Sequence, residues 1–323
     1  MTGLTEFPQT GRVLVIGEAI LDFLPTSRGA LSDQVAWHVH SGGAPANVAI
    51  GLALHGVPVQ LASVLGADPF GTQLKAMVEA AGVDCDHVRR LDEEPTGLCF
   101  VTLDADGERT FTHRGGHPFK TFSPDDLDGL ALGEIEVLHF GCGALRNQMT
   151  TDAVEKLIDT SDAMVTCDPG FFPRSWGDRR AVQDRLIQMM CKSQIFKCAI
   201  GDVRELLNIT TPDAAVDKIC AYGAQLVVVT HGHHGAWWGL GSKRGHVPAP
   251  QVELIDSTGA GDAFMAGLIR ALPTGDRRAQ MFDHREVAHS IMQASQQGAR
   301  AVTQLGATTA ERAYAHGLEG TSP

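Results

Sequence analysis

Short apolar segments alternate with helix-like segments along most of this 323-residue chain, and that alternation restricts its fold more than any other feature. Strands and helices in strict alternation are typical of a parallel sheet that is covered by helices on both faces. The predicted strands cover residues 12–16, 59–64, 98–103, 109–112, 137–141, 163–167, 194–199 and 226–230. The predicted helices cover residues 44–55, 70–81, 151–160, 178–193, 211–222, 260–272, 285–304 and 309–317. Ligands of such a sheet bind at the carboxyl ends of its strands.

Two segments interrupt the alternation. Residues 98–112 indicate a hairpin around the Asp-Gly turn at Asp104–Gly107, and residues 20–40 lie between the first strand and the first helix. Together these segments could form a small β-sheet lid over the site. The chain has no internal repeat, low-complexity tract or linker, so we expect one α/β domain over residues 1–323, with a lid from about 20–40 and 95–115.

The charge and cysteine content of the chain limit its partners and its compartment. The net charge is −12 at pH 7, which argues against nucleic acid or an anionic membrane surface as the main partner. The seven cysteines form no C-x-x-C pair, and no apolar stretch reaches the ~18 to 20 residues of a membrane span. We therefore expect a soluble, cytoplasmic protein with reduced cysteines.

The stretch from Asp256 to Gly267, DSTGAGDAFMAG, is the most informative motif. Its glycine-containing turn precedes an apolar run that predicts a helix, so the turn would lie at a helix N-terminus. Unpaired N–H groups and the helix dipole favour an anion there, and a carboxylate beside an anion suits phosphoryl transfer. Ordinary helix capping by Asp256, Ser257 or Thr258 is the alternative interpretation.

Two motifs together resemble the signatures of one family. Gly259, Ala260, Gly261 and Asp262 match in order the end of D-T-x-G-A-G-D, the C-terminal signature of the ribokinase-like (PfkB-type) carbohydrate kinases. The segment Ser41–Asn47, SGGAPAN, resembles the other signature of that family, G-G-x-x-x-N. Two signatures in the right order, about 200 residues apart, are more specific than either alone.

Three shorter segments extend the resemblance over about residues 12–307. Gly66–Gly71 resembles the G-x-D-x-x-G loop of the family, Gly17–Asp22 its first strand end, and Thr230–Gly235 its T-x-G-x-x-G nucleotide loop. The Gly-Glu at the first strand end is typical of the fructokinase-like branch. The resemblance implies a ribokinase-like α/β fold, in which a mostly parallel sheet has helices on both faces and a small β-sheet lid.

The resemblance also implies an activity, an ATP-dependent sugar kinase that phosphorylates a primary hydroxyl, with fructose as the first choice of sugar. It makes Asp262 the general base and the backbone of Gly259–Gly261 the anion hole. Asp256 and Thr258 would hold a monovalent cation, expected to be K⁺, and Glu205 would organise Mg²⁺ through water.

Further residues are assigned to the two substrates by the same resemblance. The sugar-binding residues would be Asp22, Gly42, Gly43, Asn47 and Arg114. The nucleotide-binding residues would be Thr230, Gly232, Gly235, Asp202 and Ser295. Two of these keep a structural alternative: Arg114 as a solvated loop charge, and Asp202 as a helix N-cap with Glu205 at the third helical position.

Some positions depart from the family pattern. Gly170 and Phe172 stand where fructokinase-like chains carry Asn and Arg, and the next arginine is Arg174. The preceding Asp168 is retained, and we expect it near the phosphates. Asp202 stands where the family has Asn or Ser.

Several alternatives therefore stay open. The acceptor could instead be ribose, 2-keto-3-deoxygluconate or a nucleoside, and the chain could be a catalytically silent sugar-binding regulatory module. A nucleotide-dependent oxidoreductase and a P-loop kinase are disfavoured, because neither G-x-G-x-x-G after the first strand nor G-x-x-x-x-G-K-[ST] occurs. A homodimer through exposed lid strands is a further option.

Overall fold

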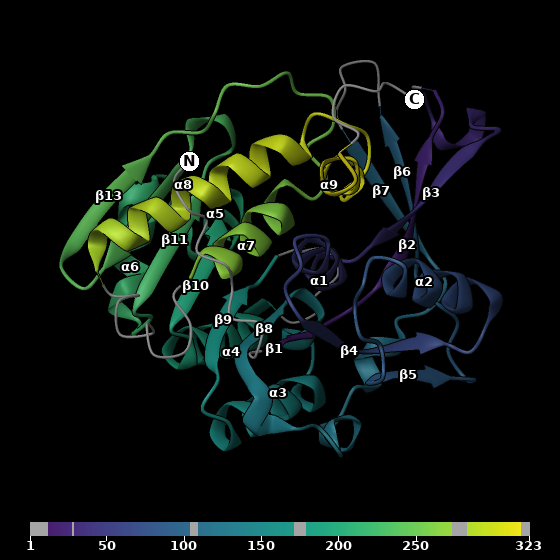
Figure 1. Cartoon of the computed structure of the whole chain (residues 1–323), viewed down its shortest axis with the longest axis horizontal. Coiled ribbons are helices and arrows are strands. Elements are labelled where there is room, and N and C mark those ends of the chain that lie inside the picture. The colour runs from purple at the N-terminus through teal and green to yellow at the C-terminus, as the bar shows by residue number, and fades with distance from the viewer. Residues whose placement is uncertain (1–11, 28, 104–108, 171–178, 273–282, 318–323) are drawn as a thin grey trace.

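A sheet of nine strands forms the centre of the described chain, in the order β13-β12-β11-β10-β9-β8-β1-β4-β5 (Figure 1). The structure is a computed structural model that describes residues 12–27, 29–103, 109–170, 179–272 and 283–317. The predicted turn at Asp104–Gly107, together with Phe172 and Arg174, lies outside these residues. The strands are β1 Arg12–Ile16, β4 Val59–Gly66, β5 Val88–Leu91, β8 Ile135–Gly141, β9 Met164–Asp168, β10 Ile195–Ala199, β11 Leu226–Thr230, β12 Ala236–Leu240 and β13 Lys243–Val247. All pairings among them are parallel except those of β12, which pairs antiparallel with β11 and β13.

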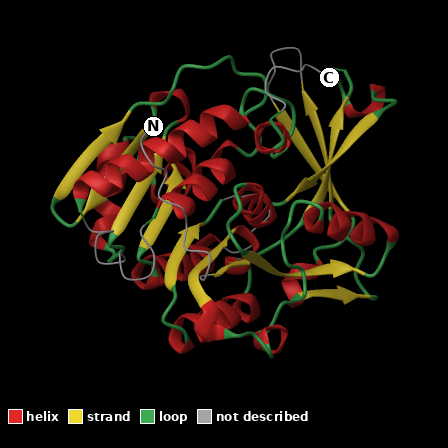
Figure 2. Ribbon diagram, viewed as in Figure 1, coloured by secondary structure: helices red, strands yellow, loops and turns green. Residues whose placement is uncertain are grey.

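Helices cover both faces of this sheet (Figure 2). One face carries α1 Ala44–Leu54, α2 Pro69–Glu79, α7 Ala260–Ala271 and α8 His284–Ala301. The other face carries α3 Gln148–Thr160, α4 Arg179–Lys192, α5 Ile200–Leu207 and α6 Pro212–Ala221. Strand β1 shows how the two core layers arise, since Val13 and Val15 pack into the first and Leu14 and Ile16 into the second. The last helix, α9 Thr309–Ala315, contacts α8 and α1.

A second, smaller sheet lies at one end of the molecule, beside α2 and α9 (Figure 1). Its order is β3-β2-β6-β7, with β2 Ile20–Pro25, β3 Trp37–Gly42, β6 Leu98–Leu103 and β7 Arg109–Arg114. The predicted α/β fold with a separate small sheet is therefore confirmed. Each predicted strand and helix is present, with ends that differ by a few residues.

The prediction omitted the edges of the main sheet. Strands β5, β12 and β13 were not predicted, and the short helix α5 was considered only as the capping alternative for Asp202. The residues of β13, KRGHV, are polar and mostly exposed, because this strand lies at an edge and buries little. Strand β5 has only four residues, two of them arginines. Apolar periodicity cannot identify strands of this kind.

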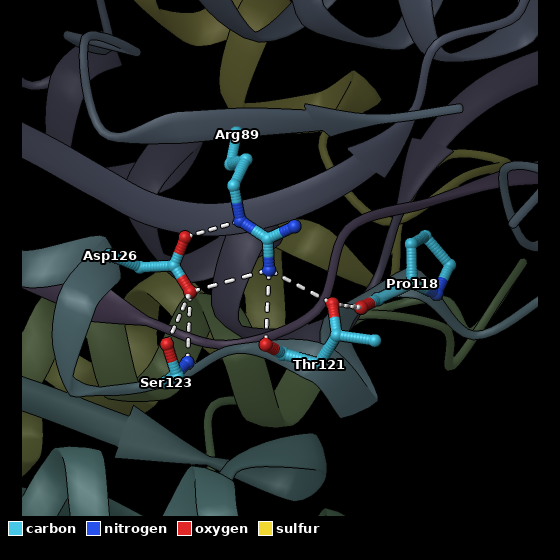
Figure 3. A network of polar contacts seen from close by, with 5 residues as sticks. All are labelled: Arg89, Pro118, Thr121, Ser123 and Asp126. Atoms are coloured by element: carbon cyan, nitrogen blue, oxygen red, sulfur yellow. Dashed lines mark hydrogen bonds and ion pairs between the residues drawn. The ribbon is translucent and has the colours of Figure 1, made fainter. Parts of the chain in front are cut away.

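Arg89 of β5 anchors that edge strand to the segment between β7 and β8 (Figure 3). Its Nη2 donates to the carbonyl oxygen of Thr121 at 3.0 Å and to Thr121 Oγ1 at 2.9 Å. Its Nε pairs with Asp126, whose Oδ2 accepts a hydrogen bond from the Ser123 N–H at 2.8 Å. One arginine thus holds two turns of the connection in place.

Asp68 joins α2 to the segment that leads into β6. Its Oδ1 accepts from the Gly71 N–H at 2.7 Å and from Thr96 Oγ1 at 2.8 Å, and its Oδ2 accepts from the Thr96 N–H at 2.7 Å. Burial alone would raise the pKa of Asp68, but these hydrogen bonds outweigh it and lower the pKa. The middle residue of the Gly66–Gly71 loop is therefore a helix cap and a clamp on the small sheet.

We predict that Asp68→Ala lowers the free energy of unfolding by about 2 kcal/mol, because it removes a helix cap and leaves buried donors unpaired. Urea unfolding followed by circular dichroism measures this change. Asp68→Asn retains the cap and should lose less. Equal losses in the two variants would contradict the capping role.

Candidate active site

The N-terminus of α7 is shaped by a glycine that no other residue could replace without strain. Gly259 is the N-cap and has φ 75°, in the left-handed region. A Cβ on Gly259 would lie 2.5 Å from the Cβ of Ala307. The N–H groups of Gly261 and Asp262, in the first turn, donate to no backbone acceptor among the described residues. They leave an anion-binding position at the positive end of the helix dipole.

Asp256 does not cap α7, so the simple capping interpretation of this stretch is wrong. Its Oδ1 accepts from the Thr258 N–H at 2.7 Å, and its Oδ2 accepts from the Gly306 N–H at 2.8 Å. The residue is 1% exposed. This carboxylate holds the turn before α7 against the loop before α9.

Asp262 and Asn47 meet although they lie in different signatures. Asn47 Nδ2 in the first turns of α1 donates to Asp262 Oδ2 at 2.8 Å. The remaining amide oxygen of Asn47 is buried and has no partner among the described residues, and the same holds for Ser41 Oγ at the end of β3. The amide oxygen of Asn47 is thus available to a ligand beside Asp262.

The paired glycines bring a second carboxylate to this place. Asp22 lies on β2 and is buried, and a Cβ on Gly42 would lie 2.3 Å from its carboxyl carbon. Gly43 has φ 91°, and a Cβ there would lie 2.5 Å from the carbonyl oxygen of Glu18. The glycines let β3 turn into α1 directly against Asp22.

Both carboxylates have raised pKa values. Burial raises the pKa of Asp22 to about 7, and the nearby charges of Asp262 and Glu18 add to the shift. Burial raises the pKa of Asp262 to about 6. The hydrogen bond from Asn47 lowers the pKa of Asp262, and the charge of Asp168 raises it. Perturbed acids gathered at the end of a sheet indicate a functional site.

The small sheet brings His113 to the site's side of the sheet, and it directs Arg114 away. Across the four strands, Asp22 lies opposite His40 of β3 and Cys99 of β6, and Cys99 lies opposite His113 of β7. Successive side chains point to opposite faces of a strand, so Arg114 lies on the face away from Asp22. Its side chain is exposed and its Nη1 donates to the carbonyl of His113 at 2.9 Å. Arg114 is not brought together with the other predicted sugar residues.

The predicted nucleotide residues lie at and beyond the carboxyl end of β11 and on α8. Thr230 ends β11, and its Oγ1 donates to the Cys198 carbonyl at 3.4 Å. Gly232 and Gly235 have φ 51° and 99°, and a Cβ on Gly235 would lie 2.2 Å from the carbonyl oxygen of Val247. Ser295 on α8 is buried, and its Oγ has no partner among the described residues.

Asp202 is not the N-cap of α5, so the predicted capping register is wrong by one turn. Ala199 is the N-cap, and its N–H donates to Asp202 Oδ2 at 3.2 Å. Glu205 lies one turn further along α5 and is exposed. Within the described segments, no group of three or more His, Cys, Asp or Glu residues could hold a metal by itself.

Sequence reasoning missed Lys197, which lies on β10. Its Nζ lies 2.6 Å from Asp168 Oδ2 and donates to the Gly261 carbonyl at 3.3 Å, within the first turn of α7. The lysine is 3% exposed. A lysine inside the apolar strand sequence IFKCA was the available signal, because lysine is almost never fully buried unless it is paired.

The fold and the site together are those of a ribokinase-like sugar kinase. Residues 10–313 match the family described as pfkB family carbohydrate kinase, and the chain belongs to that family. The predicted family is therefore confirmed, and the fructokinases described next confirm its fructokinase-like branch. In the described part of the chain, no helix is long and apolar enough to cross a membrane.

Three known proteins show how near the likeness is. The chain is 32% identical over 268 residues to a fructokinase of Klebsiella pneumoniae, and this match covers 81% of this chain and 84% of that protein. It superposes on a fructokinase double mutant of Vibrio cholerae, in its fructose-, ADP- and potassium-bound form, with a TM-score of 0.82 at 25% identity, covering 96% and 98% of the two chains. The aminoimidazole riboside kinase of Salmonella enterica gives a TM-score of 0.80 at 25% identity, covering 95% and 99%.

The raised pKa of Asp22 predicts a stability cost at neutral pH. The folded state, with a pKa of about 7, holds this proton at pH values where the unfolded chain has lost it. The contribution to stability is full below the unfolded pKa near 3.8 and is lost as the pH rises to about 7. We expect Asp22→Asn to raise the free energy of unfolding at about pH 8, by at most about 4 kcal/mol.

Urea unfolding at a series of pH values measures this difference, which should shrink toward zero near pH 4. The exposed Asp152→Asn on α3 is the control and should change little at any pH. A difference for Asp22→Asn that is constant with pH would contradict the raised pKa.

Proposed function

We propose that this sugar kinase is an ATP-dependent fructokinase that transfers the γ-phosphoryl group to a primary hydroxyl of fructose. The observation that carries the proposal is the position of Asp262, a half-buried acid bonded to Asn47 beside unpaired N–H groups at the start of α7. A base, an anion site and ligand-facing polar atoms thus lie together. The likeness to fructokinases over nearly the whole chain supports fructose as the acceptor.

Asp262 accepts the proton of the attacking hydroxyl. With a pKa of about 6 it is ionised in most molecules near neutral pH, and it is a stronger base than an ordinary aspartate. The hydrogen bond from Asn47 fixes the direction of its carboxylate. The second oxygen of the carboxylate then faces the acceptor.

The backbone from Gly259 to Asp262 stabilises the negative charge of the phosphoryl group in transfer. Gly259, Ala260 and Gly261 have little side-chain bulk, so the phosphoryl oxygens can approach the N–H groups closely. Positioning and charge stabilisation dominate this reaction, which suits a site with one modest base.

The sugar lies between the small sheet and the carboxyl edge of the main sheet. Asp22 accepts hydrogen bonds from sugar hydroxyls, and the unpartnered amide oxygen of Asn47 accepts another. Gly42 and Gly43 shape the turn that brings these groups together. The small sheet acts as a lid that excludes water and so limits ATP hydrolysis. A sugar contact by Arg114, and a homodimer through the lid, stay predictions.

The nucleotide lies along the carboxyl ends of β10 and β11. Thr230, Gly232 and Gly235 form the loop that binds it, and the free hydroxyl of Ser295 on α8 faces the adenine of the nucleotide. Asp202 and Glu205 on α5 are too few to bind a metal alone, so they suit a Mg²⁺ ion that is held by ATP phosphates and water.

A buried carboxylate at the turn before α7 suits a monovalent cation. Both oxygens of Asp256 accept from backbone N–H groups, and Asp256 with the backbone of Thr258 supplies oxygen atoms of the kind that bind hard cations such as K⁺. A bound cation there would stabilise the conformation of the anion hole.

We predict that Asp262→Asn folds and binds ATP but loses about 10²- to 10⁴-fold in kcat, because an amide cannot accept the proton. A coupled assay of ADP release measures turnover, and nucleotide-dependent thermal shift measures binding. Asp152→Asn is the control and should keep full activity. Near-wild-type turnover in Asp262→Asn would exclude the base assignment.

A panel of acceptors tests the choice of sugar. Fructose should give the highest kcat/KM, ahead of ribose, 2-keto-3-deoxygluconate and a nucleoside. The likeness to aminoimidazole riboside kinase makes a riboside the second candidate. Tight sugar binding by calorimetry without phosphorylation of any acceptor would favour the silent regulatory module.

A further inference from the structure

Lys197 and Asp168 form a buried ion pair directly beneath the first turn of α7. The parallel ladder of β9 and β10 pairs Cys167 with Phe196, so Asp168 and Lys197 are the next residue on each strand. Their charged atoms lie 2.6 Å apart, and Lys197 also donates to the Gly261 carbonyl at 3.3 Å. A Cβ on Gly261 would lie 2.9 Å from Lys197 Nζ. The glycine of the anion hole is thus packed on the lysine.

The pair belongs to a polar layer on the α7 face of the sheet. Ile195 packs on this face, and strand alternation places Lys197 there two residues later. His139 of β8 and Thr166 of β9 lie on the same face, with His139 Nδ1 3.0 Å from Thr166 Oγ1. Burial, aided by the charge of Lys197, lowers the pKa of His139 to about 3, so this imidazole is neutral.

Structural stability alone does not explain this arrangement. A buried ion pair is weak support for a fold, because the desolvation of both charges offsets much of their attraction. An ammonium group close to a helix N-terminus is also unfavourable with respect to the helix dipole. Lys197 and Asp168 are therefore placed despite a desolvation cost and an unfavourable helix dipole. Their position at the end of the sheet, beside the proposed site, indicates a role in the reaction.

We propose that Lys197 is a positioning residue for phosphoryl transfer: paired with Asp168, it holds the first turn of α7 on the ends of β9 and β10 and presents a fixed positive charge to Asp262. This inference rests on the proposed role of Asp262 as the base. Burial raises the pKa of that carboxylate, and the two opposite charges beneath the helix act on it in opposite directions.

The charges around this pair lie on several elements. Asp262 is faced by Asn47 of α1, Asp168 of β9, Lys197 of β10 and Asp22 of β2. Lys197 is faced in addition by Asp202 of α5. Burial alone would lower the pKa of Lys197, but these carboxylates outweigh it and raise the pKa, so the lysine stays charged.

The test follows the titration of Asp262 in the free protein by NMR, with ¹³C-labelled aspartate carboxyls and Asp262→Asn to assign the resonance. Lys197→Met should raise the apparent pKa of Asp262 by about one unit, because it removes the positive charge. Asp168→Asn should lower it by a similar amount, because the lysine is then uncompensated. The double variant should titrate close to the wild type. The acid limb of kcat should move in the same directions, and Lys197→Arg should restore it toward the wild-type position.

Arg89→Met is the matched control, since it also breaks a partly buried ion pair, that with Asp126, but on β5. It should lower stability and leave the titration of Asp262 unchanged. Shifts of the same sign in Lys197→Met and Asp168→Asn, or an equal shift in Arg89→Met, would overturn the proposal. If Lys197→Met does not fold, Asp168→Asn and the double variant still decide between these outcomes.

The titration needs neither sugar nor nucleotide, so it separates this inference from the proposed function. A protein that phosphorylates another acceptor but not fructose, and shows the opposite shifts, would retain the Lys197 assignment and lose the fructokinase proposal. A protein that phosphorylates fructose but shows no shifts would retain the fructokinase proposal and lose the Lys197 assignment.

Discussion

The hydrogen bond between Asn47 and Asp262 joins the two halves of the molecule, and the site depends on it. Asn47 lies in the first turn of α1, which follows β3 of the small sheet, and Asp262 lies in the first turn of α7, which follows the last strands. Both helices pack on the same face of the main sheet, so their N-termini converge at its carboxyl edge. The convergence explains why two signatures that are far apart in sequence form one site.

Close approach is the second constraint, and glycine satisfies it on both sides of the bond. Gly42 makes room for the carboxyl of Asp22, and Gly259 makes room for Ala307. In each case a glycine lets two segments approach more closely than any side chain would allow. The acids that remain, Asp22 and Asp262, are desolvated as a result, which is the main cause of their raised pKa values.

Much of the fold and part of the site could be predicted from sequence, because they depend on local pattern. The apolar strands, the long helices and the small sheet all have periodic or turn signals. Strand β13 has none, since edge strands bury little. The register of α5 differed from the prediction because Ala199, which has no capping side chain, begins the helix. The contacts of Lys197 could not be predicted from sequence, since its partners come from β9 and α7.

The row of side chains across the small sheet has a mechanical consequence. His40 lies opposite Asp22, and a Cβ on Gly306 would lie 2.8 Å from His40 Nδ1. Gly306 in turn is held by Asp256. A displacement of β3 would therefore be transmitted through a tight contact to the turn before α7. Strand β3, which lies beside Asp22, and the turn before α7 are therefore joined by a chain of tight contacts, so that a shift of one would displace the other.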